Sequence, residues 1–162
     1  VLVGGSNRQY RFTREAAERL ADQLRGLMRR HGVGLAITMS RRTGEENERR
    51  LRDALCTNDA YIWDGFGDNP YFGILGLCDM IVVTSDSVSM VSEACATGKP
   101  VHVFYLDGGS EKFRRFHLNF RQREITRTFT GEIENWSYKT LDDTGHVARE
   151  IRKRMPQLIT RD

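Results

Sequence analysis

Residues 80–104 constrain the fold of this 162-residue chain more than any other stretch. They begin with the apolar run 80–83, which has the length and β-branching of a short buried strand. A turn of small polar residues follows, then a helical stretch from Val88 to Thr97 and a Gly-Lys-Pro stop. A second apolar run, 101–104, closes the segment. Strand, helix and strand in immediate succession predict neighbouring parallel strands.

The same alternation runs along the whole chain. Strands are predicted at residues 1–3, 35–39, 60–63, 80–83 and 101–104. Helices are predicted at residues 14–30, at 70–78, at 88–97, at 111–123 and at 142–155, with one more opened by a capping box of Thr43 and Glu46. We expect a single α/β domain over residues 1–162, a Rossmann-like doubly wound parallel sheet of five or six strands. In the strand order 3-2-1-4-5, the loops after the first and fourth strands lie side by side.

Two further expectations concern the C-terminal third. Residues 126–140 are polar and carry no predicted element. The last helix is expected to bury Val147, Ile151 and Met155, which recur at helical spacing.

Composition excludes several classes of protein. The chain is 39% apolar and 29% charged, as in ordinary globular domains, and it has no membrane-spanning run and no recognisable signal peptide. Its three cysteines lack a C-x-x-C spacing, which favours free thiols in a reducing compartment, and we expect a cytoplasmic location. The net charge of +3 gives no ground for a nucleic-acid partner. Because the chain opens on a strand without an initiator methionine, we expect a fragment of a longer protein.

The polar turn of the opening segment is the first candidate site. It comprises Ser85, Asp86, Ser87, Val88 and Ser89, at a predicted helix N-terminus. Such a terminus offers unpaired N–H groups and a partial positive charge that suit phosphate. Asp86 is expected to cap the helix or to face a sugar or acceptor hydroxyl, and capping by Asp86 or Ser87 is the alternative to ligand binding.

Two other loops at the same edge carry candidates. Gly4 and Gly5, followed by Ser6, either let the backbone approach a diphosphate or simply form a tight strand exit. Arg41 and Arg42 either bind phosphate through paired N–H donors or belong to a solvated loop.

Glu93 stands one helical turn beyond Ser89 and could accept hydrogen bonds from a ribose diol; the alternative is a solvated helix glutamate. Neither G-x-G-x-x-G nor G-x-x-x-x-G-K-[ST] occurs, which disfavours dinucleotide oxidoreductases and phosphate-loop NTPases. The four histidines lack the spacing of a metal site or catalytic relay, so no metal and no catalytic residue is assigned.

The phenylalanines of residues 111–123 recur at intervals of three and four and are interleaved with basic residues. This pattern favours a core stripe with a solvated basic face, and the basic face could assist at a lipid surface.

Four segments together resemble a known family: GGSNRQYRF, SRRT, DNPYFGILGLCDMIVVTSDSVSMVSEACATGKPVHVF and SEKFRRFH. They resemble the C-terminal half of the plant mitochondrial-fission (elongated-mitochondria) proteins and their bacterial homologues, over nearly the whole chain. Some bacterial members are labelled nucleoside-diphosphate-sugar epimerases. The strand, Ser-rich turn, helix with glutamate and Gly-Lys-Pro stop are also similar to the donor-binding domain of GT-B glycosyltransferases.

The GT-B resemblance implies roles for individual residues. It implies that Glu93 holds the ribose, that the turn 87–89 and Gly4-Gly5 meet the diphosphate, and that Phe66 to Asn69 contact the base. It further implies a missing N-terminal domain that supplies the general base and most acceptor contacts.

The leading hypothesis is therefore the nucleotide-sugar-binding domain of a GT-B-type glycosyltransferase. The expected donor is a nucleoside-diphosphate sugar, and no cofactor or metal is required. One acceptor class is a membrane-associated glycolipid. Such an acceptor would place the protein at the periphery of the inner membrane. One alternative is a non-catalytic module for membrane or protein recruitment, as the resemblance to the plant proteins implies. An epimerase is the other alternative.

Overall fold

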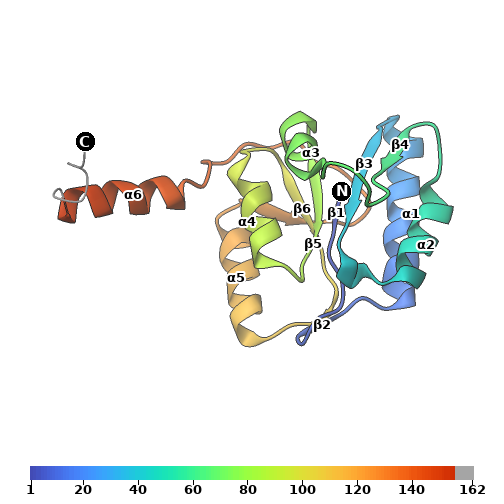
Figure 1. The fold of residues 1–162 in the computed structure, drawn as a ribbon, viewed down its shortest axis with the longest axis horizontal. Helices are drawn as coiled ribbons and strands as arrows, with labels where there is room; N and C mark the ends of the chain where they lie inside the picture. Colours follow the sequence, from blue (N-terminus) through green and yellow to red (C-terminus); the bar gives the residue numbers. More distant parts are fainter. Residues whose placement is uncertain (156–162) are drawn as a thin grey trace.

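The computed structural model describes residues 1–155 and has an α/β architecture; residues 156–162 of the predicted domain lie outside this part (Figure 1). Six parallel strands form one sheet in the order β4-β3-β1-β5-β6-β8. They are β1 (Leu2–Val3), β3 (Leu35–Met39), β4 (Ala60–Ile62), β5 (Ile81–Thr84), β6 (Val101–Phe104) and β8 (Thr126–Thr128). The predicted fold class is confirmed, and the first five of these strands have the predicted order.

The sheet carries helices on both faces (Figure 1). They are α1 (Arg14–His31), α2 (Glu45–Leu55), α3 (Tyr71–Leu77), α4 (Val88–Ala96) and α5 (Glu111–Gln122), with a short 3-10 helix η1 (Arg41–Thr43) before α2. A further helix, α6 (Asp143–Arg154), follows the last strand. None of the helices within residues 1–155 is long and apolar enough to cross a membrane.

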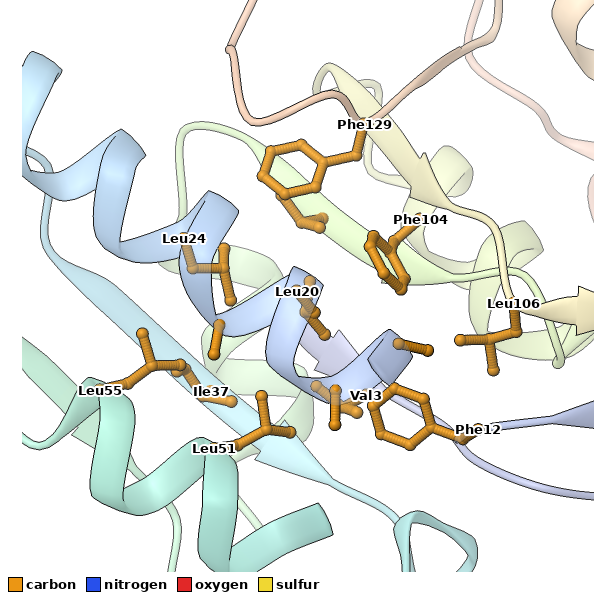
Figure 2. Close-up of a cluster of buried hydrophobic side chains, with 14 of the residues drawn as sticks. Val3, Phe12, Leu20, Leu24, Ile37, Leu51, Leu55, Phe104, Leu106 and Phe129 are labelled. Carbon is orange, nitrogen blue, oxygen red and sulfur yellow. The ribbon is translucent and has the colours of Figure 1, made fainter. Parts of the chain in front are cut away.

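Two apolar clusters lie on opposite sides of the sheet. Under α1 and α2, the first cluster includes Leu20, Leu24, Leu51 and Leu55 with Val3 of β1 (Figure 2). Beneath α4 and α5, the second cluster is built from strand and helix residues that include Leu2, Val83, Val91, Val101 and Phe120. Consecutive residues of one strand face opposite clusters, as Leu2 and Val3 of β1 do, which explains why most positions of the central strands are apolar.

Local capping signals set the ends of α1 where they were predicted. The Thr13 hydroxyl accepts a hydrogen bond from the backbone N–H of Ala16 at 3.2 Å. At the other end Gly32 adopts φ 62° and donates its N–H to the carbonyl of Met28. The left-handed conformation at this position favours glycine.

Three strands were not predicted. β8 forms within the polar stretch 126–140, because its backbone pairs with the free edge of β6 and buries Thr126. The two-residue strands β2 (Tyr10–Arg11) and β7 (Asp107–Gly108) form a separate antiparallel pair.

The predicted capping box of α2 is wrong. Gly44, at φ 81°, occupies the N-cap without a side-chain hydrogen bond. Thr43 lies in η1 instead, and its hydroxyl donates to the carbonyl of Gly4 at 2.6 Å. The threonine therefore ties two loops together rather than opening a helix.

The predicted burial of the α6 stripe is also wrong. Val147, Ile151 and Met155 are 55%, 49% and 43% exposed. The helix extends away from the rest of the domain (Figure 1), so no element of residues 1–155 covers its apolar face.

Candidate functional site

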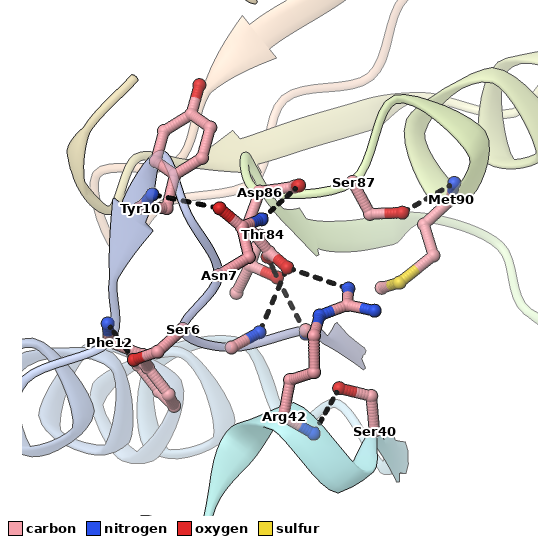
Figure 3. Close-up of polar contacts among 12 residues, drawn as sticks. Ser6, Asn7, Tyr10, Phe12, Ser40, Arg42, Thr84, Asp86, Ser87 and Met90 are labelled. Atoms are coloured by element: carbon pink, nitrogen blue, oxygen red, sulfur yellow. Dashed lines mark hydrogen bonds and ion pairs between the residues drawn. The ribbon is translucent and has the colours of Figure 1, made fainter. Parts of the chain in front are cut away.

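The loops that follow β1, β3, β5 and β6 meet at the carboxyl edge of the sheet, which is where doubly wound folds bind ligands. Figure 3 shows polar contacts that join the loops after β1, β3 and β5. The strand order reverses at β1, so the loop after β1 lies beside the loops after β3 and β5. This arrangement is the one that the sequence predicted for the candidate site.

The carboxylate of Asp86 connects three of these loops. Its side chain is fully buried, and it accepts hydrogen bonds from the Gly5 N–H at 3.0 Å, the Thr84 hydroxyl at 2.7 Å and an Arg42 guanidinium nitrogen at 3.0 Å. The Thr84 hydroxyl in turn accepts a hydrogen bond from the Gly4 N–H. Asp86 is therefore a structural anion inside the site, and its side chain neither caps α4 nor faces solvent.

Arg42 forms an ion pair with Asp86. Its side chain is 46% exposed, and one guanidinium nitrogen contacts Asp86 (Figure 3). The other guanidinium nitrogens have no hydrogen-bond partner within residues 1–155. Arg41 is exposed, and its side chain makes no hydrogen bond or ion pair in the described part of the chain. The structure thus brings one of the two predicted arginines into the site.

The N-terminus of α4 begins directly after Asp86. Ser87 is the cap, because its hydroxyl accepts a hydrogen bond from the Met90 N–H at 3.4 Å. Val88 and Ser89 follow in the first turn and are both exposed. The first-turn N–H groups and the helix dipole make this end favourable for an anion.

Ser85, by contrast, is turned into the protein. It is completely buried, and its hydroxyl accepts a hydrogen bond from the Leu106 N–H at 3.0 Å. Its carbonyl lies 2.9 Å from Nε2 of the buried His117 on α5. Since a carbonyl only accepts, the imidazole proton is on Nε2. Burial lowers the pKa of His117, which favours the neutral ring.

The glycines of the first loop allow close packing inside the protein. A Cβ on Gly4 would lie 2.2 Å from a carboxylate oxygen of Asp86, and a Cβ on Gly5 would lie 1.9 Å from the carbonyl oxygen of Arg42. Both glycines are buried, which supports the tight strand exit. Ser6 is exposed, and its hydroxyl accepts a hydrogen bond from the Phe12 N–H at 2.9 Å.

A second group of candidates lies on α4 and in the loop before α3. Glu93 is exposed on α4, and its carboxylate accepts a hydrogen bond from the Tyr71 hydroxyl. Asn69 accepts a hydrogen bond from the Tyr71 N–H at 3.0 Å, and Phe66 is 81% exposed in the loop before α3. The contact between Tyr71 and Glu93 therefore links the candidate base loop to the candidate ribose residue.

A cavity lies at the opposite edge of the sheet. It has a volume of about 750 Å³, and its lining includes Val1, Leu35, Ile74 and Met80 at or near the amino ends of the strands. None of the candidate site residues lines it. The candidate site residues lie away from this cavity, at the polar carboxyl edge of the sheet. Within residues 1–155, no group of three or more histidine, cysteine or acidic side chains is placed to hold a metal ion.

Comparison with known proteins identifies the family. The family model described as mitochondrial fission ELM1 matches residues 1–155. The chain belongs to the mitochondrial fission ELM1 family. It is 38% identical over 159 residues to the mitochondrial fission protein ELM1 of Arabidopsis thaliana, covering 96% of this chain and 37% of that protein.

A bacterial relative matches the same region of the chain. The uncharacterized protein RP120 of Rickettsia prowazekii (strain Madrid E) is 30% identical over 164 residues, covering 94% of this chain and 45% of that protein. The chain thus spans less than half the length of either relative. No solved structure matches it significantly.

Proposed function

We propose that this ELM1-family chain binds the nucleoside diphosphate part of a sugar donor, as the donor-binding domain of a GT-B-type glycosyltransferase. The observation that carries the proposal is the Arg42 guanidinium, held by buried Asp86 next to the N-terminus of α4. A fixed guanidinium beside a helix N-terminus suits a diphosphate, since both groups favour negative charge. Because Asp86 is already neutralised by Arg42 and two further donors, it does not repel that ligand strongly.

The remaining candidates extend the site along the donor. The ribose would reach Glu93, and the base would lie against the loop that contains Phe66 and Asn69. When the bond between the sugar and the diphosphate breaks, negative charge grows on the leaving diphosphate. Arg42 and the α4 N–H groups would stabilise that charge.

In this proposal, the acceptor-binding site and the general base belong to a part of the protein outside these 162 residues. Both relatives are more than twice as long as the region that matches them. We propose that an N-terminal domain closes the site and presents the acceptor, with a membrane-associated glycolipid as one acceptor class. The 162-residue chain should then bind donors but not transfer sugars.

Calorimetry with uridine, guanosine, adenosine and cytidine diphosphates tests the donor site. We expect at least one to bind the 162-residue chain, and Glu93→Ala to weaken that binding at least about tenfold, since the ribose would lose its acceptor. The matched control is Glu124→Ala, a change of an exposed glutamate after α5. No binding of any diphosphate at millimolar protein would remove the proposal's support.

A non-catalytic recruitment module is the second candidate. The name of the plant relative, mitochondrial fission protein, favours it. So do Phe72 and Leu77, two large apolar side chains of the short helix α3 that are exposed and offer apolar surface to a partner. Substitution of Arg42 distinguishes the two candidate functions. A donor site requires the Arg42 guanidinium, whereas a docking surface on α3 does not.

A further inference from the structure

A side-chain contact between two helices fixes the orientation of Glu93. The hydroxyl of Tyr71, at the start of α3, donates a hydrogen bond to Oε2 of Glu93 on α4. Within residues 1–155 this is the one hydrogen bond that the Glu93 side chain makes. The carboxylate is exposed, so Tyr71 alone selects one of its rotamers.

Tyr71 is itself held firmly. Its ring is half-buried against the apolar cluster beneath α4 and lies edge-to-face with Phe72, at a centroid distance of 5.3 Å and an angle of 81°. Its backbone N–H donates to the Asn69 side chain. A tyrosine has only two main side-chain torsions, so these contacts place its hydroxyl at a defined point.

The contact leaves Glu93 able to bind a diol. An ionised carboxylate has about four lone-pair positions, and Tyr71 occupies one of them. Burial, together with the hydrogen bond to Glu93, raises the pKa of Tyr71, so its hydroxyl keeps the proton that it donates. A pre-oriented carboxylate loses less rotamer freedom when two ribose hydroxyls bind to it.

We propose that Tyr71 is a positioning residue that orients Glu93 toward the 2′- and 3′-hydroxyls of a ribose, and that the pair makes the site select ribonucleoside over 2′-deoxyribonucleoside diphosphates. This inference rests on the proposed donor site and adds a specificity to it. A site built to bind a hydroxyl leaves its own polar group unpaired when the ligand lacks that hydroxyl. Because Glu93 is exposed and water can replace the missing group, the selectivity is moderate.

Calorimetry on the 162-residue chain with paired ribo- and 2′-deoxyribonucleoside diphosphates tests the inference. We expect wild-type protein to prefer the ribo form about tenfold. Tyr71→Phe removes only the hydroxyl, and should weaken binding of the ribo form about fivefold while leaving the 2′-deoxy form within about twofold. The selectivity ratio should therefore fall to about two. A merely structural role would weaken both forms equally.

Two controls keep the outcomes separate. Tyr61→Phe changes an exposed tyrosine on β4, at the cavity on the other edge of the sheet, and should leave the ratio unchanged. In the Glu93→Gln background, Tyr71→Phe should have no further effect on the ratio. An unchanged ratio in Tyr71→Phe overturns the role of Tyr71 and leaves the donor site intact. Failure of wild-type protein to bind any diphosphate overturns both.

Discussion

At the scale of single residues, the candidate site depends on Asp86. Its buried carboxylate holds the backbone after β1, the end of β5 and the side chain of Arg42 from the loop after β3. Removing such a buried charge partner leaves donors unsatisfied, and removing Arg42 leaves the carboxylate short of one partner. Contacts among three loops therefore determine the position of the Arg42 guanidinium, and its own loop alone does not.

A second buried residue, His102 of β6, makes stability depend on pH. Its ring is 1% exposed, lies edge-on to Trp136 at 4.9 Å, and accepts the Glu134 N–H at Nε2. Burial lowers the pKa of His102 to about 4, so the folded protein holds it neutral. Below pH 6.5 the unfolded chain binds a proton that the folded chain does not. The contribution of neutral His102 to stability is therefore complete above pH 6.5 and is lost as pH falls toward 4.

The expected size of this effect is about 2 kcal/mol of unfolding free energy between pH 7 and pH 5. Urea unfolding at the two pH values measures it, and His102→Gln should lower the difference by about this amount. The part that remains includes the contribution of His117, whose pKa burial also lowers. His146→Gln, at an exposed histidine of α6, should keep the whole difference. If His102→Gln fails to fold, NMR titration of the histidines in wild-type protein measures the pKa of His102 directly. Protonation of His102 in the folded protein near pH 6.5 contradicts the account.

Part of the candidate site could be predicted from neighbouring residues. The Ser87 cap and the anion-binding end of α4 follow from a polar turn between an apolar strand and a helix. The partners of Asp86 could not be predicted, because Gly5 and Arg42 lie 81 and 44 residues away in the chain. The contact of Tyr71 with Glu93, 22 residues apart on two helices, left no sequence signal for the same reason.

At the scale of elements, periodicity and caps predicted most helices within a residue or two. The predicted helix 14–30 is observed as Arg14–His31, because its stripe and both of its ends are encoded locally. β8 escaped prediction because the sequence Thr-Arg-Thr has no apolar run, and pairing with β6 makes it a strand. The α6 pattern correctly predicted a helix with an apolar face, but the expected burial of that face is wrong within residues 1–155.

The exposure of α6 predicts an unequal response to matched substitutions. Ile151→Ala on α6 should change the unfolding free energy of the 162-residue chain by less than about 0.5 kcal/mol. Ile81→Ala, at a fully buried position of β5, should cost about 2 to 4 kcal/mol because it opens a cavity in the core. Urea denaturation of both variants measures the difference. Equal losses would mean that α6 packs against the domain.

At the scale of the whole molecule, the sheet separates two surfaces. The carboxyl edge gathers the polar loops around Arg42 and α4, while the apolar cavity opens at the amino edge. The strand order that creates this separation was predicted from the alternation of elements, since connection rules leave few topologies. In our proposal a second domain closes this carboxyl edge, and both relatives are long enough to contain one.

The central claim is that Arg42 and the N-terminus of α4 bind a diphosphate, and adjacent arginines test it directly. Calorimetry on the 162-residue chain should show that Arg42→Gln weakens nucleoside diphosphate binding at least about tenfold, while Arg41→Gln changes it less than about twofold. Arg42→Lys, which keeps a charge near Asp86, should give an intermediate value and guard against loss of folding. Equal binding by wild-type, Arg41→Gln and Arg42→Gln proteins would contradict the claim.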